Sequence, residues 1–229
     1  MKILDRTSQR STLRQPVALI AFGIVAVMAA GLAGCGSSSD SRQRNSELTP
    51  ADIACADGGA CVVGDIGPGG GIVFITPETE GNTRPDYYLE AAPLNGFAAE
   101  NCADGKNDAE IGTGKSNTEI AGKSCRSGDE LNAMQLADNL VFNGLDDWFL
   151  PSQLELNQLC RYAWNLTVDN TATTCTGGIG TIRTGFSLID YWSSSEYDAS
   201  LTRYHYFTSG GQANYAKYLV LYVRPVRAG

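Results

Sequence analysis

The sequence offers one histidine, His205, and one run of three serines, residues 193–195, that could support acyl transfer. Such chemistry needs a base that takes the proton from the serine hydroxyl. His205 lies between Tyr204 and Tyr206 in a strand-like stretch, where we expect an exposed or half-buried position. We expect the serines to hydrogen-bond loop backbone instead. The sequence therefore predicts no serine–histidine active site.

Two pairs of adjacent carboxylates could also act as acid and base. Asp129 and Glu130 lie at a predicted helix start, and Asp146 and Asp147 lie in a predicted turn. Carboxylates stabilise helix N-termini and tight turns without any chemistry. We predict no catalytic residue and no cofactor, and we expect a protein that is not an enzyme.

Cys35 has a different chemistry. A basic N-terminal segment is followed by residues 17–33, which carry no charge, and then by the sequence Leu-Ala-Gly-Cys ending at Cys35. This arrangement resembles the signal peptide of bacterial lipoproteins, in which the cysteine is acylated and becomes the new N-terminus. An uncleaved signal anchor is the alternative. Gly36, rather than aspartate, follows the cysteine, so we expect a lipid-anchored protein of the bacterial envelope, at the outer membrane or cell surface.

The other six cysteines predict a disulfide framework, because an even number in an exported chain is typical of one. Six cysteines allow many pairings, and local closure favours neighbours in the sequence. The predicted pairs are Cys55–Cys61, Cys102–Cys125 and Cys160–Cys175. A metal site is the alternative. We predict none, because no pair has the C-x2-C spacing and the chain has a single histidine.

The charge excludes several classes of partner. Residues 1–34 hold four of the 17 basic and one of the 25 acidic residues, so the remainder has a net charge of −11. Such a surface repels phosphate backbones and anionic lipid headgroups. We expect no nucleic-acid partner, and contact with the membrane only through the lipid anchor.

Three regions follow from these observations: a signal peptide at 1–34, an acylated cysteine with a polar, flexible tether at 35–54, and one ligand-binding domain at 55–229. The domain opens on a glycine-rich run at 64–71. A phosphate cradle is excluded there, because no Lys-Ser/Thr and no helix follow. Strands are predicted at 72–75 and 87–92.

Two helices are predicted next, each from a capping box. The first runs from Ser127, with Glu130, toward Gly144, and the second begins at Ser152, with Glu155. A cysteine-tied loop covers 165–187. Strands follow at 191–196 and 202–208, then a hairpin turn at 209–212 and a long central strand at 215–226.

Six motifs in order resemble a domain-of-unknown-function family that includes the C-terminal domain of the Legionella collagen-like adhesin. The match covers about residues 62–227. The motifs are Gly64-Asp65-Ile66-Gly67-Pro68-Gly69-Gly70-Gly71-Ile72-Val73-Phe74, Leu89-Glu90-Ala91-Ala92-Pro93, Ile111-Gly112-Thr113-Gly114 with Asn117-Thr118, Asp147-Trp148-Phe149-Leu150-Pro151-Ser152 with Glu155-Leu156, Tyr191-Trp192-Ser193-Ser194-Ser195-Glu196 and Val223-Arg224-Pro225-Val226-Arg227.

The resemblance implies an α+β, C-type-lectin-like fold with mainly antiparallel mixed sheets, paired N- and C-terminal strands and two helices. It also implies a ligand face made of loops and late strands. The calcium-binding Glu-Pro-Asn and Trp-Asn-Asp signatures of glycan-binding lectins are missing from this sequence, so no calcium ligand is predicted. Trp148 and Trp192 are expected in the core, and Glu155 as a cap. The terminal arginines are expected to pair with acidic loops such as Asp146-Asp147.

Tyrosines concentrate in the late strands and favour a binding face there, because tyrosine gives a large, rigid contact area. The sequence predicts that the exposed members of one group bind a protein or glycan. That group is Tyr197, Asp198, Ser200, Arg203, Tyr204, His205, Asn214, Tyr215 and Lys217.

Three alternatives stay open for this chain. The domain could be the variable protein of a diversity-generating retroelement, since several of the nine residues are reachable from an Asn codon by changes at adenines. It could be a structural envelope lipoprotein without a dedicated ligand. The third is an enzyme of the formylglycine-generating-like superfamily. The sequence does not indicate an oligomeric state.

Overall fold

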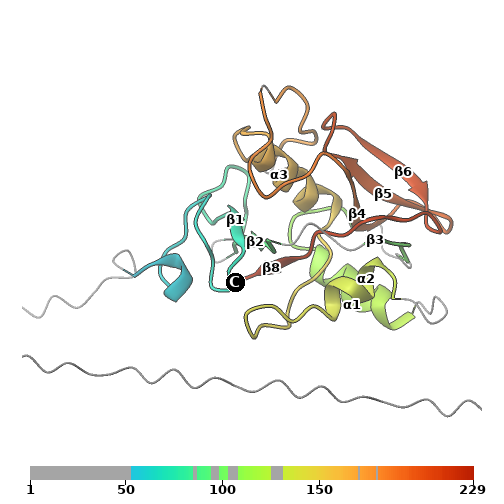
Figure 1. Cartoon of the computed structure of the whole chain (residues 1–229), viewed down its shortest axis with the longest axis horizontal. Helices are drawn as coiled ribbons and strands as arrows, with labels where there is room; N and C mark the ends of the chain where they lie inside the picture. Colours follow the sequence, from blue (N-terminus) through green and yellow to red (C-terminus); the bar gives the residue numbers. More distant parts are fainter. Residues whose placement is uncertain are drawn as a thin grey trace, which may run out of the picture. The chain divides into compact units, whose positions relative to one another are not determined.

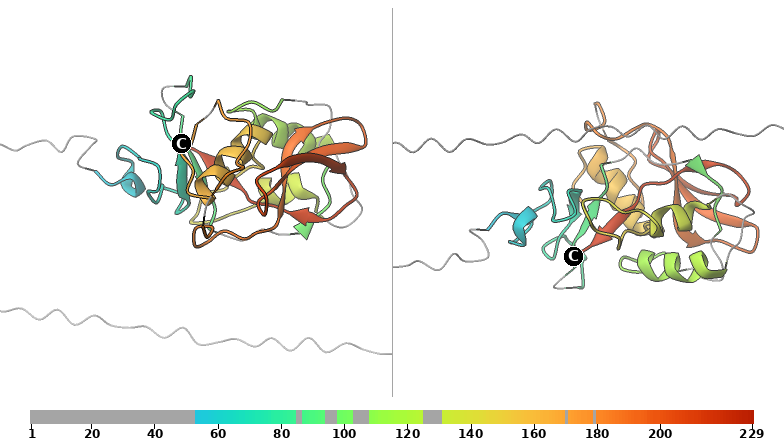
Figure 2. Two further views of the ribbon diagram at one scale, coloured as in Figure 1. Left: turned by 90° about the horizontal axis from the view of Figure 1, so that it is seen from above. Right: turned by 60° about the horizontal axis from the view of Figure 1, so that its bottom comes forward.

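The computed structural model describes residues 53–84, 87–93, 98–102, 108–124, 131–169, 171–178 and 180–229, all within the unit Ser46–Gly229. The predicted signal peptide, Cys35 and the tether before residue 53 lie outside the described residues, as do Cys125 and residues 127–130. Figures 1 and 2 show the described elements.

A small antiparallel sheet joins strands from the two ends of the domain. Its order is β1-β2-β8, and the strands are β1 (Ile72–Ile75), β2 (Leu89–Ala91) and β8 (Val226–Ala228). Ala91 pairs with Ile72 on one side and Val226 on the other. The predicted strands at 72–75 and 87–92 are confirmed. The 3-10 helix η2 (Cys55–Asp57) precedes this sheet.

A larger sheet contains the late strands. In the described residues its order is β3-β7-β4-β5-β6, and only the β4–β7 pair is parallel. Its strands are β3 (Ala98–Ala99), β4 (Asp190–Glu196), β5 (Leu201–Tyr206), β6 (Gln212–Ala216) and β7 (Leu221–Tyr222). The strand predicted at 191–196 is confirmed. The strand predicted at 202–208 is present but ends at Tyr206, and the predicted hairpin turn lies at 207–211, with Gly210 at φ 75°.

Helices cover both faces of the larger sheet, as Figure 1 shows. They are α1 (Gly114–Ser124), α2 (Ala133–Asp138) and α3 (Gln153–Ala163). On one face, Tyr191 and Phe207 pack with apolar residues of α3. On the other face, Trp192 and Tyr204 pack with residues of α1 and α2. The α+β class is thus confirmed, and so are the core positions of Trp148 and Trp192, which are 1% and 0% exposed.

The helix prediction is wrong in two places. Helix α1 was not expected, because its sequence is polar and carries glycine at both Gly114 and Gly122. The first predicted helix is shorter than expected: α2 begins after Asn132, whose side chain accepts from Gln135 N–H in a capping box. Leu131 lies before the helix and is exposed.

The long central strand predicted at 215–226 is also wrong. This segment contains the end of β6 and the short β7, and it leaves the larger sheet to form β8 in the smaller one. Pro225 has no N–H for a continuous ladder. The apolar residues of the segment also pack in two different core clusters, Val223 in one and Val226 in the other. Among the described strands, β6 lies at the edge of the larger sheet and not at its centre.

The glycine-rich run wraps around a buried carboxylate. Glu90 accepts from Gly69 N–H at 2.9 Å and from Gly71 N–H at 3.0 Å. A Cβ on Gly67 would lie 2.4 Å from Glu90 Oε2, and one on Gly69 would lie 2.6 Å from Oε1. Glycine is therefore required here for close approach of the backbone.

Arg227 completes this arrangement. Its guanidinium lies 3.1 Å from Glu90 and 2.5 Å from Asp147. The expected pairing of a terminal arginine with the Asp146-Asp147 loop is confirmed for Asp147. These ion pairs link β2, β8 and the segment before Trp148.

Helix α3 begins as predicted, with Ser152 and Glu155 as a capping box. Glu155 is fully buried and does more than cap the helix. Its Oε1 accepts from Gly112 N–H at 2.7 Å and from Tyr87 O–H at 3.0 Å, while Oε2 accepts from Ser152 N–H at 2.8 Å. One carboxylate therefore joins three segments.

Two predicted disulfides are confirmed, Cys55–Cys61 and Cys160–Cys175. Cys102 is disulfide-bonded as well. Its predicted partner, Cys125, lies outside the described residues. The Cys160–Cys175 bond ties the middle of the long loop to α3, and Cys175 N–H donates to Gly210 O in the hairpin turn.

Candidate ligand-binding surface

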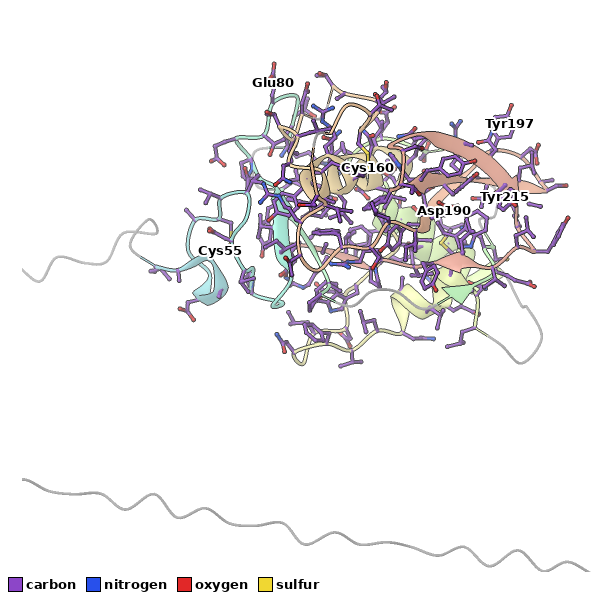
Figure 3. All side chains as sticks on the ribbon, turned by 45° about the horizontal axis from the view of Figure 1, so that its top comes forward. Cys55, Glu80, Cys160, Asp190, Tyr197 and Tyr215 are labelled. Carbon is purple, nitrogen blue, oxygen red and sulfur yellow. A yellow bond between two sulfur atoms is a disulfide. The ribbon has the colours of Figure 1, made fainter. Side chains whose placement is uncertain are left out.

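The nine predicted residues all lie on or beside the β5–β6 hairpin, but the structure gives them different environments. Tyr197, Asp198, Ser200 and Tyr215 are exposed; Arg203, Asn214 and Lys217 are partly exposed; Tyr204 and His205 are buried. Figure 3 places Tyr197 and Tyr215 at this hairpin, away from Cys55. Seven of the nine residues are therefore at least partly accessible, and Tyr204 and His205 are not.

The strand register divides the group between two faces. Thr202 pairs with Tyr215, and Tyr204 pairs with Ala213, so Tyr204 and Tyr215 lie on one face. Arg203 pairs with Asn214 on the opposite face, which His205 shares. Because successive side chains of a strand alternate, a run of neighbouring residues cannot form one flat site.

Aromatic rings build the first face. The ring of Tyr204 lies 5.2 Å from that of Tyr215, 4.6 Å from Tyr206 and 6.0 Å from Trp192. Tyr204 O–H donates to Tyr206 Oη. Burial, followed by the contact with Tyr206, raises the pKa of Tyr204. Nearby Asp190 also has a pKa raised by burial. Tyr204 thus supports the exposed ring of Tyr215 from below.

The opposite face presents an aromatic–cation pair. The Arg203 guanidinium lies 5.5 Å from the ring centre of Tyr197. Asp198 holds the preceding turn, since its Oδ1 accepts from Ser200 N–H at 2.7 Å and from Leu201 N–H at 2.8 Å. Asp198 and Ser200 therefore shape the turn that presents Tyr197.

Lys217 lies at the far end of β6, where its ammonium is 2.5 Å from Glu196 Oε1. Both side chains are largely buried, with exposed fractions of 17% and 10%. The ion pair fixes the end of β6 against β4. Lys217 is thus a structural support of the surface.

The expected exposure of His205 is wrong: the side chain is 1% exposed. Its Nε2 lies 3.1 Å from Asn157 Oδ1 on α3. Asn157 Nδ2 donates to Ala172 O, so its oxygen faces the imidazole and Nε2 must carry the proton. His205 is buried because its face of the sheet packs against α3.

His205 also lies beside the Cys160–Cys175 bond. One ligand atom from each of the three residues falls within 4.8 Å of the others. Metal coordination by cysteine requires thiolates, and these sulfurs are joined in a disulfide. With the bridge closed, the three side chains cannot act as a cysteine–histidine metal site.

The three serines of β4 bind neighbouring segments. Ser193 O–H donates to Arg203 O at 2.9 Å and Ser195 O–H donates to Asp108 O at 2.8 Å. Ser194 Oγ accepts from Asn117 Nδ2. The expected bonding of this run to backbone is confirmed for Ser193 and Ser195, and no hydrogen bond joins a serine of the run to His205 in the described chain.

Several exposed residues near the hairpin were not predicted. Tyr218, Val220 and Tyr222, on the segment from β6 to β7, are 72%, 58% and 40% exposed. Tyr206 supports Tyr204 from the same face. The alternation of side chains along β5 could have placed Tyr206 on the face of Tyr204. Tyr218, Val220 and Tyr222 were missed because they lie in the segment that was wrongly predicted to be a buried central strand.

No protein-family model and no curated protein matches this chain. In the part of the chain that the structure describes, every helix is too short or too polar to cross a membrane.

Proposed function

We propose that this chain is a lipid-anchored bacterial envelope protein whose C-type-lectin-like domain binds a protein ligand at the β5–β6 hairpin. The observation that carries the proposal is the edge position of β6, which has exposed aromatic side chains on both sides of it. We expect an extended ligand segment to add to this edge as a further strand.

The backbone of β6 is suited to such addition. Lys217 N–H donates to Ser200 O, and Tyr206 N–H donates to Gly211 O. Hydrogen-bonded pairs alternate along an antiparallel ladder, so Ala213 and Tyr215 face β5. Gln212 and Asn214 then turn their N–H and C=O groups toward the open edge. An added strand would bond to them.

The side chains favour the same type of ligand. An added strand projects its side chains alternately to both faces of the sheet. One set would meet the ring of Tyr215, and the other would meet Tyr197 with Arg203. A glycan cannot supply the backbone N–H and C=O groups that pair with a strand edge, so the open edge of β6 favours a protein.

The lectin-like fold is supported by the small sheet that contains both the first strand, β1, and the last strand, β8. The envelope location is supported by the Leu-Ala-Gly-Cys sequence that ends at Cys35. A tether after the anchor would present the hairpin to partners outside the membrane.

Binding can be tested with a peptide selected on the domain from a random displayed library. We expect Tyr215→Ala and Tyr197→Ala each to weaken binding by about 1–3 kcal/mol, because they remove aromatic anchors. Asn214→Pro should abolish binding, since it removes an outward N–H that the β5 ladder does not use. Isothermal titration calorimetry measures all three effects.

Asn214→Ala and Val141→Ala are the controls, because the first keeps the N–H and the second removes an exposed apolar side chain after α2. Both should bind the peptide as the wild type does. N-methylation of alternate peptide amides tests strand addition without changing the domain. If peptides bind equally well to folded Asn214→Pro, strand addition is disproved. If neutral glycans bind selectively and need Tyr215, the ligand is a glycan and not a protein.

Attachment is tested separately by Cys35→Ser. We expect this variant to lose all labelling by a metabolic acyl probe, because the thiol is the acceptor of the lipid, and to be released or left unprocessed. Undiminished labelling of the variant would show that the anchor is elsewhere. Ser37→Ala is the control and should be labelled as the wild type is. Substitution of one of the later cysteines is not suitable, because it would break a disulfide.

A further inference from the structure

A recess lies in a part of the domain away from the hairpin surface. It has a volume of about 200 Å³ and lies between the glycine-rich run and the loop at residues 183–186. Ile66, Ile72, Pro93 and Phe186 contribute apolar walls. Arg183 and Arg224 also line it, and no carboxylate does among the residues that the structure describes. Two cations on an apolar recess are unusual in a chain with a net charge of −8.

Arg183 is held in a fixed orientation. Its guanidinium lies 4.4 Å from the ring centre of Tyr162, and its Nε donates to Tyr162 O at 2.8 Å. Within the described residues, its two terminal nitrogens donate no hydrogen bond. An arginine fork prepared in this way is suited to bidentate binding of a carboxylate.

Arg224 forms the buried part of the same wall, with an exposed fraction of 2%. Its Nη1 donates to Gly185 O at 3.0 Å, and the guanidinium lies 4.7 Å from the ring centre of Phe186. Arg183 and Arg224 together bring two guanidinium groups to this recess. Positive charge from two arginines favours an anionic ligand over a neutral one.

The structure assigns to this recess the binding of a small monocarboxylate with an apolar body. The carboxylate would bind to Arg183, and the body would lie against Ile66, Ile72 and Phe186. Pockets for drug-sized ligands occupy about 300–1,000 Å³, so this smaller volume fits a small acid. The site is independent of the hairpin surface.

The neighbouring groove indicates which way such a ligand would lie. It measures about 580 Å³ and shares Tyr162 and Arg183 with the recess. Glu78 and Glu80 line the groove but not the recess. Their negative charges disfavour a carboxylate in the groove, so the anionic end belongs on the side of Arg224.

Calorimetry with benzoate and its neutral analogue benzamide tests the assignment on the folded domain. We expect benzoate to bind at least tenfold more tightly than benzamide. Arg183→Gln should weaken benzoate binding at least tenfold, and Arg183→Lys should weaken it less, because lysine keeps the charge and loses the fork. Lys123→Gln removes an exposed positive charge from α1 and should bind benzoate as the wild type does.

Equal binding of benzoate and benzamide to the wild type, or no binding of either, would overturn the assignment. So would an Arg183→Gln variant with an unchanged melting temperature and unchanged affinity for benzoate. If Arg183→Gln proves unstable, the comparison of benzoate with benzamide on Arg183→Lys decides, because a charge-selective site keeps its preference for the acid.

Discussion

Glu155→Ala should lower the free energy of unfolding by about 3–5 kcal/mol. The carboxylate accepts hydrogen bonds from Gly112, Ser152 and Tyr87, which belong to three different segments. Removing it leaves these donors buried without an acceptor and opens a cavity. Urea denaturation followed by circular dichroism gives the change directly.

Glu155→Gln separates hydrogen bonding from packing, because it keeps the volume of the side chain. Its amide group offers one oxygen in place of two, so at least one donor must face an NH2 group. We expect a loss of about 2 kcal/mol. Glu119→Ala, at an exposed position of α1, should change stability by less than about 0.5 kcal/mol. A loss below about 1 kcal/mol for Glu155→Ala would contradict the role assigned to this carboxylate.

The single histidine should make the fold sensitive to acid. Burial lowers the pKa of His205 to about 4, from an ordinary value of 6.5. The neighbours in its described contacts are neutral: the Asn157 amide, the Phe207 ring and the Cys160–Cys175 bridge. Within the described ranges of the chain, no carboxylate is in contact with His205 to stabilise an imidazolium.

The direction of the effect follows from proton binding. Between pH 6.5 and 4 the unfolded chain binds a proton at His205 and the native protein does not. The contribution of neutral His205 to the free energy of unfolding is fully present above pH 6.5 and is lost as the pH falls to about 4. The total loss is about 3 kcal/mol.

Unfolding measured from pH 4 to 7 for the wild type and for His205→Gln tests this expectation. Both proteins contain the same carboxylates, so the difference between their pH profiles belongs to His205. Since the chain has one histidine, its imidazole NMR signal needs no assignment. A native imidazole that titrates near pH 6.5 would refute the prediction.

Local sequence signals predicted the elements whose contacts are themselves local. The start of α3 follows from Ser152 and Glu155, which are three residues apart, and the β5–β6 turn follows from Gly210 and Gly211. Helix α1 has no comparable signal. It is fixed by distant contacts, such as Thr118 Oγ1, which accepts from Leu150 N–H at 3.0 Å.

The sequence predicted where the candidate surface lies, but not which of the nine side chains are exposed on it. The concentration of tyrosine located the hairpin correctly. It could not show that Tyr204 faces the α1–α2 side while His205 faces α3, because that depends on the register with β6 and on the helices packed against each face. The edge position of β6 also depends on where the chain leaves the larger sheet.

The small sheet has a consequence for the order of folding. Leu89 pairs with Ala228, and the contact between Glu90 and Arg227 spans 137 positions of the chain. Contacts of such long range slow folding, because much of the chain must be ordered before they form. While the chain folds, β2 keeps an unpaired edge until β8 docks against it. We therefore expect the glycine-rich run to close around Glu90 late, after the β5–β6 hairpin has formed.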